Sequence, residues 1–165
     1  MRAVLSEPDD TTAWKWSHEL EKYFHGTPSG IDTGLALGGG ARLFFPKLGS
    51  IPESEKIRLP NRLPIIYGSV PRQGTTKELV SSVKIKLQSD PSHIKPALER
   101  LGKISVEAAE EFKAGPSWQK IGRLANEAHL LLTNPLGVGS PLLDSAIQVG
   151  KNAGAAGGKI SGAGG

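Results

Sequence analysis

Residues 25–32, with the sequence HGTPSGID, place one acidic side chain, Asp32, directly after a turn rich in glycine and proline. A carboxylate in the first turn of a helix complements the positive end of the helix dipole. Ser29 and Asp32 also have the spacing of a capping box, so helix capping is the favoured interpretation of these two residues alone. A serine-hydrolase nucleophile is not predicted, because Ser29 lacks the G-x-S-x-G frame and no residue is identified as its base.

A second carboxylate, Glu21, lies eleven residues before Asp32. Mg²⁺ binds one or two carboxylates together with phosphates and waters, so a single glutamate is a sufficient protein contribution to a magnesium site. On the residues alone, a solvated side chain beside Glu19 and Lys22 is the favoured interpretation. The metal role therefore depends on information from the rest of the chain.

Two further segments are suited to bind an anion or a substrate. The sequence TTKE at residues 75–78 matches a capping box with Thr75 as the N-cap. The sequence GKISGAGG at residues 158–165 is a glycine-rich turn, and the backbone N–H groups of such turns can bind anions. It is neither a Walker A loop nor a Rossmann fingerprint, and taken alone it is typical of a flexible tail.

The elements that must position these groups follow from the hydrophobic pattern. Residues 13–24 carry apolar side chains at helical spacing (Trp16, Leu20, Tyr23 and Phe24). A short helix is expected after Ser29, then strands at residues 41–45 and 63–70 with a loop or domain crossing at 46–60. The remaining expected elements are a helix that begins near residue 75, three helices that span about 93–113, 117–132 and 140–152, and a short terminal strand at 159–160.

This order predicts an α+β fold with a domain boundary between residues 46 and 62. The composition adds few constraints: 165 residues, 38% hydrophobic, carry a formal net charge of +4 without a run of basic residues, so a nucleic-acid partner is not predicted. No cysteine is present, which excludes disulfides. The start of the chain lacks a signal-peptide pattern, and no apolar stretch is long enough to span a membrane.

Taken together and in this order, the four segments resemble those of the GHMP kinases. H-G-x-P-S-G-I-D is similar to the mevalonate kinase form of a characteristic GHMP segment, and residues 69–80 (SVPRQGTTKELV) are similar to its V/I-P-R-x-T-K-x-L-V segment. KISGAGG resembles the opening of the third GHMP motif. Asn126-x-x-His129 and the sequence LGVG at 136–139 also follow the mevalonate kinase pattern, and we interpret them as scaffold, with Gly137 and Gly139 serving a turn.

The resemblance implies a role for each candidate residue. Asp32 is the catalytic carboxylate that faces the hydroxyl group, and Glu21 helps to hold the Mg²⁺ that bridges the phosphates of ATP. The implied phosphate loop contains Gly162, Gly164 and Gly165. The implied substrate-binding residues are Thr76, Ala163, His25 and Ser29. Because the stretch between Arg72 and Thr76 is two residues longer than the family form, Thr75 stays an alternative to Thr76.

The implied reaction is the ATP-dependent phosphorylation of the 5-hydroxyl of mevalonate to 5-phosphomevalonate, in cytoplasmic isoprenoid precursor synthesis, without a nucleic-acid or membrane partner. The resemblance also allows a homodimer. The alternatives are another GHMP kinase, of the phosphomevalonate, galactose or homoserine type, and a truncated product without catalytic activity.

The same resemblance predicts that residues 1–55 are the end of the family's N-terminal domain and that residues 56–165 are an incomplete C-terminal domain. No segment resembles the family's ATP-binding motif P-x-x-x-G-L-x-S-S-A or the N-terminal segment whose lysine pairs with the catalytic aspartate. The chain is therefore expected to be truncated at both ends. We expect the isolated 165 residues to be inactive and the complete protein to be a kinase.

Overall fold

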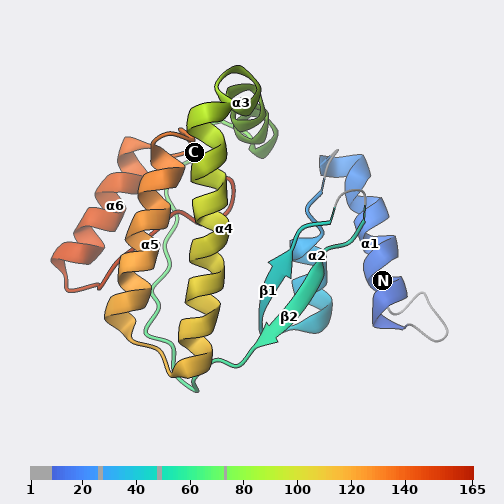
Figure 1. Ribbon diagram of the computed structural model, residues 1–165, viewed down its shortest axis with the longest axis horizontal. Coiled ribbons are helices and arrows are strands. Elements are labelled where there is room, and N and C mark those ends of the chain that lie inside the picture. The colour runs from blue at the N-terminus through green and yellow to red at the C-terminus, as the bar shows by residue number, and fades with distance from the viewer. Residues whose placement is uncertain (1–8, 26–27, 48–49, 73) are drawn as a thin grey trace. The chain divides into compact units, whose positions relative to one another are not determined.

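The computed structural model describes residues 9–25, 28–47, 50–72 and 74–165, which form helices and one small sheet (Figure 1). The chain divides into two compact units, Met1–Leu59 and Pro60–Gly165. The division falls inside the boundary region expected from the sequence, four residues after the end of the predicted first domain. Among the described residues, no helix is both long and apolar enough to cross a membrane.

The first unit contains two helices and a two-stranded sheet. Helix α1 spans Asp10–His25 and helix α2 spans Ile31–Gly38. Strands β1 (Ala41–Phe45) and β2 (Glu53–Ile57) pair antiparallel, with Ala41 opposite Ile57 and Phe45 opposite Glu53. The stretch at residues 46–60, expected to be a loop or a domain crossing, therefore contains a strand that the sequence did not predict. The sequence ESEKI of β2 has only one apolar, β-branched residue, Ile57, and its hydrogen bonds to β1 decide its conformation.

Helix α1 forms as its periodicity predicts, but the apolar residues that define this periodicity are exposed. Trp16 is 59% and Tyr23 88% exposed, and Leu20 is also exposed. The side chain of Phe24 lies outside the described residues. The buried face of α1 instead contains Ala13 and His18, and α1 contacts α2.

The second unit is built from four helices: α3 (Thr76–Ser89), α4 (Pro91–Ala114), α5 (Trp118–Thr133) and α6 (Pro141–Asn152). Each of these helices begins after a side chain that accepts a hydrogen bond from a backbone N–H of the first turn, as N-cap residues do (Thr75, Asp90, Ser117 and Ser140). Helices α4 and α5 lie side by side (Figure 1). Their interface contains the buried core, with Ile104, Leu124 and Ala128 at its centre.

Two strands expected in the second unit are not formed. Residues 63–70 run as an extended segment, and Ile66 and Tyr67 are 99% and 94% exposed. Residues 159–160 are not a strand either, although Ile160 is buried. A strand needs a neighbour to satisfy its N–H and C=O groups, and none lies beside these segments in the described ranges. With six helices and one sheet among the described residues, the α+β class is confirmed.

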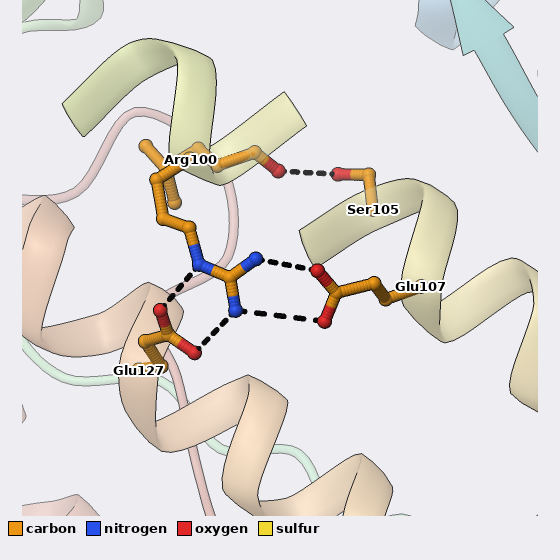
Figure 2. Close-up of polar contacts among 5 residues, drawn as sticks. Arg100, Ser105, Glu107 and Glu127 are labelled. Atoms are coloured by element: carbon orange, nitrogen blue, oxygen red, sulfur yellow. Dashed lines mark hydrogen bonds and ion pairs between the residues drawn. The ribbon is translucent and has the colours of Figure 1, made fainter. Parts of the chain in front are cut away.

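Helices α4 and α5 are also joined by an ion-pair network centred on Arg100 (Figure 2). The guanidinium group of Arg100 donates to both carboxylate oxygens of Glu127 on α5, with Nη2 at 2.8 Å from Oε2. It also donates to Glu107, two turns further along α4. The hydrogen bonds to Arg100 lower the pKa of Glu127, and the bonds to Glu127 and then Glu107 raise the pKa of Arg100.

Replacing Arg100 with methionine is expected to lower the melting temperature at pH 7 by about 2 °C, because partly exposed ion pairs stabilise proteins only weakly. The pKa of Glu127 is lower in the folded chain than in the unfolded chain. The stabilisation is therefore present at pH values above about 4.3, the pKa of a glutamate in an unfolded chain. It is lost as the pH falls through the lower pKa that Glu127 has in the folded chain. Thermal unfolding of both proteins at pH 7 and pH 3 measures this, with Lys103→Met on the same helix as control. An equal loss at both pH values would contradict the charge-based account.

Candidate active site

The first unit places Asp32 at the start of helix α2. Asp32 is the second residue of α2 and is exposed, and no hydrogen bond or ion pair to its carboxylate occurs within the described residues. The N-cap is Gly30, whose φ of 73° lies in the left-handed region. The capping box predicted for Ser29 and Asp32 was wrong: no side chain caps the start of α2 among the described residues, and the hydroxyl of Ser29 accepts from the N–H of Ile31, at 3.3 Å. Asp32 therefore does not cap the helix, and its carboxylate can bind a ligand.

Glu21 and His25 lie one turn apart on helix α1. The side chain of Glu21 is half-buried, and it has no hydrogen bond or ion pair within the part of the chain that the structure describes. Its neighbour Glu19 instead pairs with Lys22. The side chain of His25 lies outside the described residues. An unpaired, partly exposed carboxylate suits a hard cation that takes most of its ligands from phosphates and water, although the described residues hold no cluster of three metal-binding side chains.

In the second unit, the two candidate threonines have different environments. Thr75 forms the complete capping box of α3: its hydroxyl accepts from the N–H of Glu78 at 3.2 Å, and its own N–H donates to the Glu78 carboxylate at 2.7 Å. The bonds from the backbone N–H and then the hydroxyl of Thr75 lower the pKa of Glu78. Thr76 follows as the first residue of α3; it is exposed, and its hydroxyl has no partner in the described chain. Thr76 is therefore the better placed of the two to contact a substrate.

The C-terminal glycine-rich segment is attached to helix α5. The side-chain oxygen of Asn126 accepts from the N–H of Gly158 at 3.1 Å, and its amide nitrogen donates to the carbonyl of Ala156 at 3.5 Å. Gly122 and Gly157 bring the two backbones together, because a Cβ on Gly157 would lie 2.0 Å from the carbonyl oxygen of Gly122. The contact explains why glycines stand at both positions.

The turn at residues 162–165 lies against the loop between α5 and α6. Gly162, Gly164 and Gly165 all have φ between 76° and 97°. The N–H of Gly165 donates to the carbonyl of Val138 at 3.0 Å, and a Cβ on Gly164 would lie 2.0 Å from the same oxygen. The N–H groups of Gly162 and Ala163 donate to no acceptor within the described ranges. These groups are therefore available to an anion such as a phosphate.

The loop that holds the turn is itself fixed from two sides. Lys86 on α3 donates to the carbonyl of Leu136 at 2.8 Å. The buried His129 on α5 pairs with Asp144 on α6 at 3.0 Å, and Gly137 takes a φ of 71°. Helix α3, which begins at Thr76, and the glycine turn are thus both bonded to residues 136–138. The scaffold interpretation of this region agrees with these contacts.

Lys159 lies just before the turn and is exposed overall, yet desolvation of its ammonium group lowers its pKa. Its ammonium group donates to the carbonyl of Ile160 at 2.6 Å. Lys159 is thus turned back onto its own backbone.

The structure assembles the candidate residues in two groups. Glu21, His25, Ser29 and Asp32 belong to the first unit, and Thr76, Ala163 and Gly162, Gly164 and Gly165 belong to the second. Asn126, which anchors the glycine-rich segment, was interpreted as scaffold from the family pattern, and its hydrogen bonds agree with that interpretation. Sequence reasoning missed Trp14 and His18 on α1, both of which contact Gly30 or Gly34.

The chain is similar to known proteins in sequence and in fold. The family model for the C-terminal part of GHMP kinases matches residues 105–165. A mevalonate kinase of Pyrococcus abyssi is 34% identical over 155 residues, covering 92% of this chain and 44% of the relative. A mevalonate kinase of Mus musculus is 35% identical over 155 residues, covering 87% and 36%. The structure also resembles L. major mevalonate kinase, solved in complex with R-mevalonate, with a TM-score of 0.71 and 28% identity over 87% of this chain and 43% of that one.

Residues 105–165 therefore belong to the C-terminal domain family of the GHMP kinases, and the chain has an α+β fold like that of a mevalonate kinase. Within that superfamily its relatives are mevalonate kinases, as the segment H-G-x-P-S-G-I-D predicted, and it corresponds to their C-terminal part. It spans less than half of the length of these relatives, between 36% and 44% of those named here.

Proposed function

We propose that the protein containing these residues transfers the γ-phosphoryl group of ATP to the 5-hydroxyl oxygen of mevalonate. The observation that carries this proposal is the similarity to mevalonate kinases over 92% of the chain, together with the fold shared with an enzyme solved in complex with R-mevalonate. The carboxylates of Glu21 and Asp32 and the N–H groups of Gly162 and Ala163, all without a partner among the residues that the structure describes, support it. The cytoplasm is the proposed location, and a homodimer stays a prediction.

Asp32 is proposed to hold the 5-hydroxyl in line for attack on the γ-phosphorus. The oxygen–phosphorus bond to mevalonate forms as the bond to ADP breaks, and the proton of the alcohol passes to the Asp32 carboxylate. An ionised aspartate is a weak base towards an alcohol, so the orientation of the hydroxyl contributes as much as proton removal. Asp32 lies in the first turn of α2, where the positive end of the helix dipole complements a negative charge.

The other residues are proposed to bind the two substrates. Glu21 would hold Mg²⁺, which would offset the negative charge of the ATP phosphates. Gly162 and Ala163 offer backbone N–H groups to a phosphate oxygen, and the hydroxyl of Thr76 offers a hydrogen bond to mevalonate. His25 and Ser29 complete the proposed substrate pocket.

The experiment is ADP release by the longest natural reading frame that contains these residues, with ATP, Mg²⁺ and a panel of alcohols. Turnover that depends on R-mevalonate and exceeds that with phosphomevalonate, galactose and homoserine supports the proposal. Turnover with another member of the panel would replace mevalonate with that alcohol. No turnover by a folded protein that binds ATP would reject mevalonate as the substrate, and the truncated non-catalytic product would then be the better account.

The isolated 165 residues are proposed to be inactive. Phosphoryl transfer depends on positioned phosphates and metal. No segment of these 165 residues resembles the ATP-binding motif of the family. The same ADP-release assay on the 165 residues measures this. ADP release above background by this chain would contradict the proposal of inactivity without affecting the proposed reaction.

A further inference from the structure

The carbonyl oxygen of Gly30 accepts three hydrogen bonds two residues before Asp32. The indole Nε1–H of Trp14 donates to it at 2.9 Å, the N–H of Gly34 at 3.0 Å and the hydroxyl of Thr33 at 3.2 Å. The last two donors belong to α2 itself, as in the first turn of any helix. The indole comes from α1, so Trp14 is the donor that joins the start of α2 to another element.

The ring of Trp14 is fixed by packing as well as by its hydrogen bond. A Cβ on Gly34 would lie 2.3 Å from the Cζ2 atom of Trp14, so the ring lies directly on the backbone of α2. On β1, Phe44 packs edge-to-face on the same indole, with ring centroids 6.3 Å apart. Trp14 is therefore held against both α2 and β1 of the first unit. Its N–H has a defined direction towards Gly30.

His18 lies one turn further along the same face of α1 and occupies the space beside Gly30. It is 5% exposed, and its Nδ1 has no partner within the described residues. A Cβ on Gly30 would lie 3.1 Å from that Nδ1 and 2.9 Å from Cδ of Pro52. Together with a φ of 73°, these contacts leave room only for glycine at the N-cap of α2. The α1 helix thus presents two residues, at positions 14 and 18, to the turn that carries Asp32.

We infer that Trp14 is a positioning residue for Asp32: its indole N–H fixes the carbonyl of Gly30 and, through it, the direction in which the first turn of α2 presents the carboxylate. The inference rests on the proposed phosphoryl transfer for its effect on rate. A displacement of about 1 Å in a reacting group can lower a rate a hundredfold. Trp14 does not touch a substrate in this account and acts only through Gly30.

The test uses Trp14→Phe, which keeps an aromatic side chain at this position and removes the indole N–H donor together with part of the ring. In ¹⁵N NMR spectra of the 165-residue chain, the indole resonance lost in Trp14→Phe belongs to Trp14. We expect its N–H to exchange with solvent much more slowly than that of Trp16, which is 59% exposed. We also expect the backbone N–H of Gly34 to exchange faster in Trp14→Phe. Equal exchange of the two indoles, or unchanged exchange at Gly34, would overturn the inference, whatever the protein catalyses.

The kinetic arm uses the complete reading frame. Trp14→Phe is expected to lower kcat for mevalonate about tenfold with an unchanged KM for ATP. Trp118→Phe, the same substitution in the second unit, is expected to leave both constants unchanged. An unchanged kcat in a Trp14→Phe protein whose Gly34 amide has lost protection would overturn the positioning role. Absence of turnover in the unsubstituted protein would reject the proposed function instead, and the exchange measurements would then decide the inference alone.

Discussion

Replacement of Asp32 with asparagine is expected to lower kcat for mevalonate about 1,000-fold in the complete protein. The amide has nearly the same shape as the carboxylate but cannot accept the proton of the 5-hydroxyl, and it places no negative charge beside the hydroxyl. Asp32 is exposed and has no partner in the described chain, so no internal bond is lost with its charge. We therefore expect the loss to fall on kcat, with the KM for ATP nearly unchanged, in steady-state ADP-release assays.

The control for Asp32→Asn is Glu19→Gln, which makes the same chemical change on α1 of the same unit. Glu19 pairs with Lys22 on the surface, and its replacement is expected to leave kcat unchanged. Both variants are expected to melt within about 2 °C of the unsubstituted protein, since an exposed first-turn acid contributes little to stability. If Asp32→Asn kept more than a tenth of the activity while folded, Asp32 would not be the catalytic carboxylate.

The helix starts of the second unit could be predicted because their determinants are local. Thr75 with Glu78, and Ser140 followed by Pro141, specify a cap within four residues, and the structure forms both caps as expected. The same rule failed at Ser29. There Gly30 adopts a left-handed conformation and becomes the N-cap, and the packing of His18 and Pro52 against Gly30 enforces this arrangement. Those contacts come from residues far from Ser29 in the sequence.

The strands were predicted less well, because a strand depends on its partner. Residues 41–45 form the expected strand, but their partner is the mostly charged sequence ESEKI at 53–57, whose only residue typical of a strand is Ile57. Residues 63–70 carry a strong strand signal and remain unpaired. Intrinsic preference is outweighed in both cases by whether a neighbour offers hydrogen bonds. No periodicity within one segment contains that information.

For the candidate site, the resemblance identified the candidate residues themselves. It did not identify the residues that hold them in place. Trp14 and His18 are spaced by four residues on α1, and so are Gly30, the N-cap of α2, and Gly34 in its first turn. This matched spacing is a signal of two helices in close contact, but it becomes visible only when the two helices are known to pack together. The exposed Trp16, Leu20 and Tyr23 obscured it, because they form the more apolar face of α1. Asn126 was recognisable only as part of a family pattern.

The glycine turn leads to the second large expected effect. Gly164→Ala is expected to lower kcat/KM for mevalonate at least about 100-fold, because the turn must move by about 1 Å or more to accept the methyl group. The added Cβ would lie 2.0 Å from the carbonyl oxygen of Val138, a backbone atom that Lys86 and Gly165 help to hold through the same loop. A φ of 84° adds backbone strain for any residue with a side chain. Steady-state kinetics of the complete protein measure the loss.

Gly162→Ala separates the two causes, because Gly162 has a φ of 76° but nothing within 4 Å of an added Cβ. This variant introduces the strain without the clash, so its expected cost is about 1–2 kcal/mol and its loss of kcat/KM is smaller. Gly102→Ala, on α4 with open space around the added methyl, is expected to stabilise the protein by up to about 1 kcal/mol and to leave activity unchanged. If Gly164→Ala were no worse than Gly162→Ala, the contact with Val138 would not position the turn. The N–H groups of Gly162 and Ala163 would then need another support to bind a phosphate.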